Sequence, residues 1–184
     1  MHLVDPYPAP ARWVWVVRHG ESTWNAIGRM QRQVGHPPLT AKGIEQAYAA
    51  GFALRDRDVA RVISSDAIRA RQTAQAIATV LEVEIAVDPR LRERGWNTTG
   101  PIAADSAVPP RLEDPTARVT RIVEEIAALP GATVVVTHGD IVCLMLDMLR
   151  ARTAENAHWG DGLAVPNGAV IPMRLDRRSG IRSR

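Results

Sequence analysis

Short apolar runs alternate with segments of helical periodicity along this chain, and this alternation limits the folds open to it. Strands are predicted where β-branched and aromatic residues cluster, at 13–17, 59–64, 83–87, 133–137 and 169–175. Helices are predicted at 40–57, 67–81, 116–129 and 141–150. Strands that alternate with helices bury a sheet between helical layers. The sequence therefore predicts an α/β fold, a three-layer α/β/α sandwich around a mostly parallel central sheet.

The first predicted helix has a recognisable start and an apolar face. Thr40 precedes it as a candidate N-cap, because a threonine hydroxyl can accept a backbone N–H of the first helical turn. Ile44, Ala47, Tyr48 and Gly51 recur at helical spacing. We expect this face to pack against the rest of the fold.

One long segment, 90–114, has no clear periodicity. It contains two glycines and three prolines, which break both helices and strands. A segment of this kind inside an α/β domain is often functional. It is predicted to be an active-site loop or lid.

Length and composition bound the class of protein. At 184 residues the chain fits one domain, 1–184, and we expect its ends, 1–12 and 177–184, to be flexible tails. The single cysteine, Cys143, excludes an internal disulfide and a cysteine-rich zinc site. No apolar run approaches the roughly 18 residues of a membrane span, and residues 1–12 lack a signal-peptide pattern. A soluble, cytoplasmic protein without a membrane partner is expected.

The positive charge of the chain favours a small anionic partner over nucleic acid. The net charge is +3, and its arginines are interleaved with acidic residues except for a cluster within 177–184. Nucleic-acid binding normally needs a basic stripe or patch, so it is not expected here. A few well-placed guanidinium groups suit a phosphorylated small molecule instead. Pro172 places the last predicted strand at a sheet edge, where pairing into a homodimer stays open.

Two predicted strands end in the same short signature. The first ends in Arg18-His19-Gly20, and the fourth ends in Thr137-His138-Gly139. In an open α/β sheet, ligands bind beyond the carboxyl ends of the strands. A lone histidine is usually a structural residue, but two histidines at two such ends predict a shared crevice.

Longer motifs extend this signature. In chain order they are RHGESTWN at 18–25, SSDAIRARQT at 64–73, LRE at 91–93 and HG at 138–139. Together they resemble the histidine phosphatase superfamily, which contains phosphoglycerate mutases and histidine acid phosphatases. The resemblance implies a phosphoglycerate mutase-like fold and phosphoryl transfer through a histidine.

The resemblance also implies a role for each matching residue. His19 would be the nucleophile that forms a phosphohistidine. Arg18 and Arg69 would clamp the non-bridging phosphate oxygens, with His138 as a further donor. Asn25 would add a neutral hydrogen bond. Such positioning and charge stabilisation supply most of the catalysis in phosphoryl transfer.

Three further residues are weighed against simpler interpretations. The motif register selects Arg69 over Arg71, which lies two positions along the same helix and so points elsewhere. Arg29 and Gln31 could reach the phosphate or the substrate, or could lie in a solvated loop. Asp66 stands where the family usually has proline, and we interpret it as a cap of the following helix.

Glu93 is the candidate general acid and base. It would protonate the leaving alkoxide and then deprotonate the water that cleaves the phosphohistidine, which requires a raised pKa. After Glu93 the chain departs from the family pattern, because residues 94–100 are shortened and lack its further glutamate. Asp88 and Asp105 are weaker substitutes.

Three functions remain open from the sequence. The first is a phosphomonoesterase that needs neither metal nor cofactor. The second is a mutase of the phosphoglycerate type, which must exclude water; only about two dozen residues separate Glu93 from the next helix, which favours an open site and hydrolysis. The third is a catalytically weak member that binds phosphorylated ligands.

Overall fold

The computed structural model describes residues 12–97, 111–149 and 165–175. Five strands form its main sheet: β1 (Arg12–Arg18), β2 (Val59–Ser64), β3 (Ile85–Val87), β6 (Ala132–Thr137) and β7 (Val170–Leu175). Four helices accompany them: α1 (Ala41–Leu54), α2 (Ile68–Leu81), α3 (Thr116–Ala128) and α4 (Gly139–Leu149). Every predicted strand and helix is present, with ends that differ by a few residues.

The sheet is mostly parallel, as predicted. Its strand order is β3-β2-β6-β1-β7, in which neighbours are parallel except for the antiparallel pair of β1 and β7. Pro172 lies in β7, at the edge of the sheet, where a missing N–H costs no ladder bond. The α/β fold class is confirmed.

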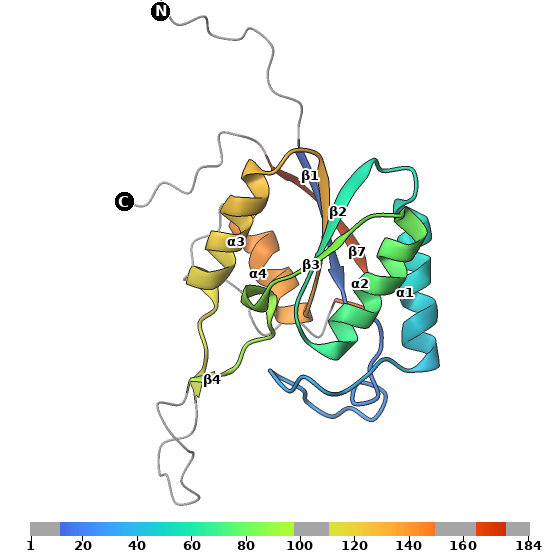
Figure 1. The fold of residues 1–184 in the computed structure, drawn as a ribbon. Helices are drawn as coiled ribbons and strands as arrows, with labels where there is room; N and C mark the ends of the chain where they lie inside the picture. The colour runs from blue at the N-terminus through green and yellow to red at the C-terminus, as the bar shows by residue number, and fades with distance from the viewer. Residues whose placement is uncertain (1–11, 98–110, 150–164, 176–184) are drawn as a thin grey trace, which may run out of the picture.

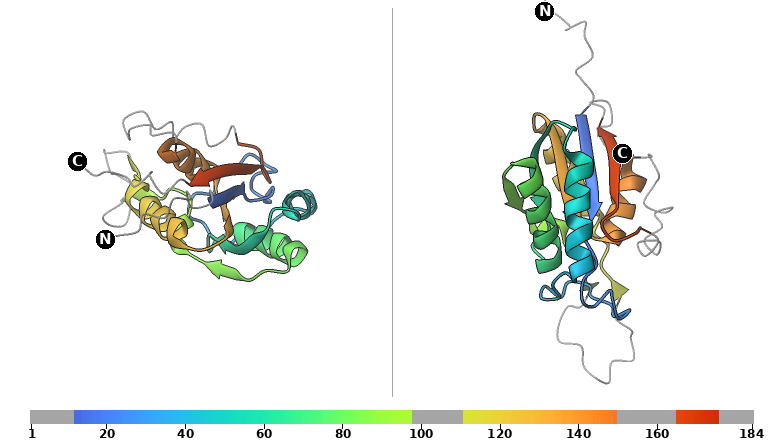
Figure 2. Two further views of the ribbon diagram at one scale, coloured as in Figure 1. Left: turned by 90° about the horizontal axis from the view of Figure 1, so that it is seen from above. Right: turned by 90° about the vertical axis from the view of Figure 1, so that its right-hand side faces the viewer.

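Two apolar clusters lie between the sheet and the helices on its two faces. One cluster joins Val14, Val16 and Val135 to side chains of α3 and α4, and the other joins Val17 and Val136 to side chains of α1 and α2. Figure 1 shows the two helix pairs on opposite sides of the strands, and Figure 2 shows the same layers from two further directions. Both faces of the central strands are buried, which explains their continuous apolar runs. In the described ranges, no helix is both long and apolar enough to cross a membrane.

The buried face of α1 differs from the predicted one. Thr40 is the N-cap, since its hydroxyl accepts the N–H of Gly43 at 3.0 Å. The helix buries Ala47 and Gly51 as expected, but Ile44 and Tyr48 are 44% and 41% exposed. The helix turns its smallest residues inward because its backbone approaches the loop after β1 closely.

The interpretation of Asp66 as a helix cap is wrong. Ala67 is the N-cap of α2, without any side-chain cap hydrogen bond. The Asp66 carboxylate instead forms a bidentate ion pair with Arg92. This pair ties the start of α2 to the segment that carries Glu93.

The predicted loop at 90–114 is partly ordered in the described residues. A short 3-10 helix spans Pro89–Leu91, and strands β4 (Trp96–Asn97) and β5 (Arg111–Leu112) pair in antiparallel register. The Glu113 N–H donates to the Gly95 carbonyl at 2.8 Å and extends this pairing. Residues 98–110, which include the candidate Asp105, lie outside the described residues.

The sheet brings the predicted motifs to one edge. Arg18 pairs with Thr137 in the β1–β6 register, and Ser64 pairs with Val136 in the β2–β6 register. The carboxyl ends of three adjacent parallel strands therefore lie at the same level. The residues that follow them, His19, Ser65 and His138, begin beside one another.

A close backbone contact fixes the chain as it leaves β1. A Cβ on Gly20 would lie 2.2 Å from the Gly43 carbonyl oxygen, and a Cβ on Gly43 would lie 2.1 Å from the Glu21 carbonyl oxygen. Only glycine permits both approaches. The Gly20 N–H also donates to the Thr73 hydroxyl of α2 at 3.0 Å. The peptide after His19 is thus held by both neighbouring helices.

This contact predicts that Gly43→Ala destabilises the protein, although alanine is the better helix former. The new methyl group must displace backbone, which should lower the free energy of unfolding by about 2 kcal/mol in urea denaturation. Glu45→Ala, at an exposed position of α1, is the control and should change it by less than about 0.5 kcal/mol. A Gly43→Ala variant as stable as the parent would refute the tight contact.

Candidate active site

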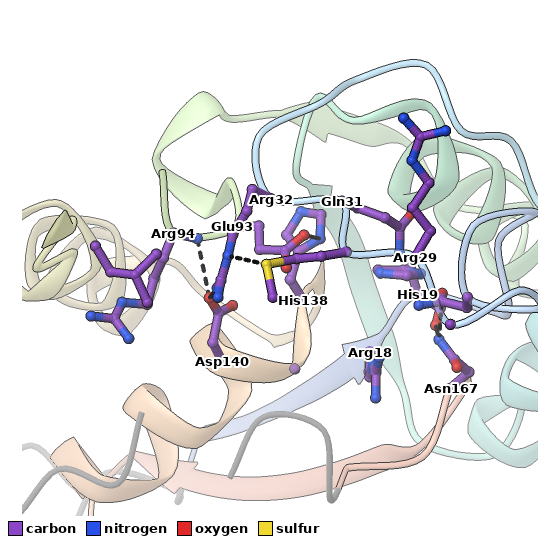
Figure 3. A pocket seen from close by; sticks show the side chains of 15 residues that line it. Arg18, His19, Arg29, Gln31, Arg32, Glu93, Arg94, His138, Asp140 and Asn167 are labelled. Atoms are coloured by element: carbon purple, nitrogen blue, oxygen red, sulfur yellow. Dashed lines mark hydrogen bonds and ion pairs between the residues drawn. The ribbon is translucent and has the colours of Figure 1, made fainter. Parts of the chain in front are cut away.

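A pocket of about 450 Å³ opens at the carboxyl edge of the sheet (Figure 3). Seven of the predicted site residues line it: Arg18, His19, Asn25, Arg29, Gln31, Glu93 and His138. The eighth, Arg69, does not line the pocket but contacts three residues that do, His19, Glu93 and His138. Residues separated by more than 100 positions in sequence therefore share one site.

The His19 ring is held in a defined orientation. Its Nδ1 lies 2.7 Å from the Gly20 carbonyl oxygen, which can only accept, so Nδ1 carries the proton. The second ring nitrogen, Nε2, lies 3.3 Å from Nε of Arg69, which can only donate. The lone pair of Nε2 is therefore directed at the guanidinium.

The His19 imidazole is neutral. It is 2% exposed, and burial together with the Arg69 charge lowers its pKa to about 3. A neutral ring keeps the lone pair that a nucleophile needs. Above about pH 4, His19 is ready to attack without first losing a proton.

Arg69 is fully buried and fixed by the backbone. Nη1 donates to the Val34 carbonyl at 2.7 Å, and Nη2 donates to the Arg32 carbonyl at 2.9 Å. Arg32 has a φ of 48°, in the left-handed region that few residues other than glycine adopt. This unusual backbone aims a carbonyl at the guanidinium. Arg71 is exposed, so of the two arginines only Arg69 reaches the site.

Arg18 provides a second buried guanidinium. Its side chain is 7% exposed, and Nη1 donates to the Val165 carbonyl. Burial lowers the pKa of Arg18, opposed by the negative charges of Glu93 and Asp140. Figure 3 shows Arg18 and His19 together at one end of the pocket.

Glu93 reaches the pocket from the segment after the 3-10 helix. The Thr137 hydroxyl donates to the Leu91 carbonyl at 2.7 Å and anchors this segment to the end of β6. Oε2 of Glu93 lies 2.8 Å from Nη2 of Arg69 and 3.8 Å from Nδ1 of His138. Burial and the neighbouring Asp140 charge raise the pKa of Glu93 to about 7 against the opposing effect of Arg69. A carboxyl with this pKa can give and take a proton near neutrality.

His138 is buried and neutral. Burial and the Arg69 charge lower its pKa well below the usual value. Its Nδ1 lies 3.3 Å from Nη2 of Arg69, and its Nε2 lies 3.0 Å from the Ser65 hydroxyl. Because Arg69 can only donate, the ring proton sits on Nε2 and faces Ser65. Donation from Nδ1 to a bound phosphate therefore requires the other tautomer.

Ser22 organises the neutral donors of the pocket. Oδ1 of Asn25 accepts the Ser22 N–H at 3.1 Å, and Oε1 of Gln31 accepts the Ser22 hydroxyl at 2.7 Å. Ser22 therefore orients both amides, with the carbonyl oxygen toward Ser22 and the NH₂ group away from it. Arg29 is exposed and stacks 3.8 Å above the Trp24 ring at the pocket wall.

Four polar or charged side chains of the pocket were not predicted from the sequence. They are Arg32, Arg94, Asp140 and Asn167. Asp140 directly follows His138-Gly139 at a strand end, and this position is the one signal that could have identified it. Asn167 donates to the His19 carbonyl at 3.1 Å from the turn before β7, which no sequence pattern marked.

The prediction of Asp88 as a substitute acid is wrong. Its carboxylate caps the 3-10 helix and pairs with Arg90, and it does not line the pocket. Among the described residues, no cluster of three or more histidines, cysteines or carboxylates could hold a metal ion. The positive charge at the site comes from guanidinium groups.

These groups have complementary capabilities. A neutral imidazole directs a lone pair into a site with two buried guanidinium groups, which attract a phosphate dianion. A carboxyl with a pKa near neutrality lies on the other side of Arg69. The arrangement can hold a phosphoryl group between a nucleophile and a proton donor.

The chain is similar to known proteins in sequence and in fold. Over 80 residues, 44% of this chain, the sequence is 48% identical to "Probable phosphoglycerate mutase GpmB" of Erwinia tasmaniensis, although the aligned part is only 37% of that protein. The structure resembles YhfR of Bacillus stearothermophilus with a TM-score of 0.75 and 23% identity, covering 91% of this chain and 93% of YhfR. It resembles a mycobacterial glucosyl-3-phosphoglycerate phosphatase with a TM-score of 0.68 and 26% identity, covering 88% and 89%.

The family match covers three of the four motifs that build the site and ends before His138-Gly139. Residues 14–102 match the family model of the histidine phosphatase superfamily (branch 1), and this range holds His19, Arg69 and Glu93. The structural neighbours share the sandwich in which these residues meet. The resemblance of the motifs to the histidine phosphatase superfamily is therefore confirmed over residues 14–102, just under half of the chain.

Proposed function

We propose that this protein is a phosphomonoesterase that hydrolyses small phosphorylated metabolites through a phosphohistidine on His19, without a metal or cofactor. The observation that carries the proposal is the orientation of His19, whose protonated Nδ1 is held by the Gly20 carbonyl while Nε2 faces the buried Arg69. An imidazole fixed in this way offers only Nε2 as the attacking nitrogen.

The first step forms the phosphoenzyme. Nε2 of His19 attacks phosphorus, and the bond from phosphorus to the ester oxygen breaks. Glu93 gives its proton to the departing oxygen. Arg18 and Arg69 hold the non-bridging oxygens as charge shifts onto them. The ring becomes cationic in this step, and the Gly20 carbonyl at 2.7 Å stabilises that charge.

The second step restores the enzyme. A water molecule attacks phosphorus, the phosphorus–nitrogen bond breaks, and its electron pair returns to Nε2 of His19. The water proton goes to Glu93, which the first step left ionised. A pKa near 7 suits both directions of this transfer.

The name of the curated relative supports a second candidate, phosphoryl transfer of the phosphoglycerate mutase type. A mutase must return the phosphoryl group to substrate before water reaches it. Among the described residues, Met30 lines the pocket and is 62% exposed, and Trp96, whose ring contacts Arg32, is 45% exposed. These exposed side chains and the phosphatase named among the structural neighbours favour hydrolysis.

Phosphate release distinguishes these two functions. With 3-phosphoglycerate and a bisphosphoglycerate primer, the proposal predicts inorganic phosphate and little 2-phosphoglycerate, because water can reach the phosphohistidine. Both products can be followed by phosphorus NMR. Rapid interconversion of the two phosphoglycerates without phosphate release would select the mutase.

Removal of the nucleophile should abolish turnover. His19→Ala is expected to lower kcat for p-nitrophenyl phosphate by at least about 10³-fold, in buffer containing EDTA. The control is His36→Ala, because His36 is exposed and contacts Trp24 rather than the pocket. Activity that survives in His19→Ala, or that EDTA removes from the parent, would refute the mechanism.

Arg69 and Arg71 form a matched pair for the phosphate clamp. Arg69→Lys keeps the charge but loses the fork of donors that reaches Val34, Arg32 and the phosphate, and should lower kcat/KM by roughly 100-fold. Arg71→Lys, on the exposed side of α2, should stay within about twofold of the parent. Equal effects of the two substitutions in a phosphatase assay would contradict the assigned clamp.

A further inference from the structure

Asp140 is a buried carboxylate in the first turn of α4 that the mechanism above does not use. It is 8% exposed and lines the pocket near Glu93 and Arg94 (Figure 3). Its Oδ1 accepts the Ile141 N–H at 2.8 Å, and its Oδ2 accepts the Arg94 N–H at 3.1 Å. Nη1 of Arg32 lies 3.9 Å from Oδ2.

The hydrogen bond to Arg94 acts directly on the peptide that follows Glu93. The carbonyl of this peptide, that of Glu93, accepts from Nε2 of Gln33 at 3.0 Å and from Nη2 of Arg118 at 3.2 Å. Its N–H donates to Asp140. The carbonyl and the N–H of the Glu93–Arg94 peptide are therefore both hydrogen-bonded. These bonds fix the backbone from which the Glu93 side chain extends.

The charge of Asp140 acts on the same carboxyl. Charged or titratable groups act on Glu93 from five segments: Arg18 at the end of β1, Arg32 in the loop after β1, Arg69 on α2, His138 after β6 and Asp140 on α4. The three arginines favour the ionised form of Glu93, and neutral His138 adds no charge. Asp140 is the one group of these five that favours the protonated form.

We propose that Asp140 is a positioning residue for proton transfer by Glu93. It holds the Glu93–Arg94 peptide in register with the pocket, and its negative charge keeps the proton on Glu93 until the ester oxygen takes it. Two nearby carboxyls that compete for ionisation assign one of them to the acid role. This inference rests on the proposed phosphatase function and concerns the same pocket.

A purely structural role for Asp140 has a different signature. A carboxylate in the first turn of a helix stabilises that helix through its macrodipole. Loss of that effect would lower stability and activity equally at every pH. A role in retaining the Glu93 proton would change activity mainly where Glu93 ionises, near and above about pH 7.

The test is the pH dependence of kcat/KM for Asp140→Asn with an alkyl phosphate, whose leaving oxygen needs a proton. Without the negative charge, Glu93 ionises more readily, so the fall in rate on the alkaline side moves toward lower pH. Relative to the parent, the variant should be within about twofold near pH 5 and roughly fivefold to tenfold slower near pH 8. With p-nitrophenyl phosphate, which needs little protonation, the difference should be smaller.

Two variants complete the design. Asp147→Asn, at the other buried carboxylate of α4, is the matched control and should leave the pH profile unchanged, because Asp147 does not line the pocket. Asp140→Glu retains the charge and should retain the alkaline limb of the parent. Should Asp140→Asn fail to fold, Asp140→Ser removes the charge and keeps an acceptor for the Arg94 N–H.

An alkaline limb that stays in place in the charge-removing variant, or that moves toward higher pH, would overturn the inference. So would an equal loss of rate at every pH. Each of these results leaves the proposed phosphatase function intact, because the parent enzyme would still require His19. Failure of the proposed function would show separately, as a parent enzyme that releases no phosphate.

Discussion

The contact between a buried guanidinium and a neutral imidazole governs this site. Arg69 has no exposed surface, yet it stays in place because carbonyls of Val34 and Arg32 and the Glu93 carboxyl accept its hydrogen bonds. A buried charge is tolerated only with such partners. Together with burial, the same charge keeps His19 neutral. In the proposed mechanism, one side chain thus sets the protonation of the nucleophile, the position of the phosphate and the orientation of the acid.

The sheet makes this contact possible, and its elements were predictable from sequence. Continuous apolar runs such as 133–137 reflect strands that are buried on both faces, and the period of 116–129 reflects one apolar helical face. Periodicity did not predict which face of α1 is buried. The apolar side chains Ile44 and Tyr48 suggested one face, but close packing of the Gly43 backbone against Glu21 selected another. Such a contact joins distant segments and has no local signal.

The site residues that belong to motifs could be predicted from the sequence. Those outside the motifs could not. His19, Arg69, Glu93 and His138 were identified by their motifs, and they meet because adjacent strands end at one level. Asp66 was misinterpreted because its partner, Arg92, lies 26 positions away. Asp140 has only its position after His138-Gly139 as a signal, and Asn167 has none; both enter the site because α4 and the turn before β7 reach the pocket.

The central claim is that Nε2 of His19 carries the phosphoryl group during turnover. The most direct measurement is rapid acid-free quenching with a labelled phosphate ester, followed by mass spectrometry of the peptide that contains His19 and phosphorus NMR of the denatured phosphoprotein. The account predicts a phosphoramidate on His19 that is stable to alkali, labile to acid and bonded through Nε2. Label found on another residue, or on Nδ1 of His19, would contradict it. So would phosphate release with a single inversion at phosphorus and no labelled protein.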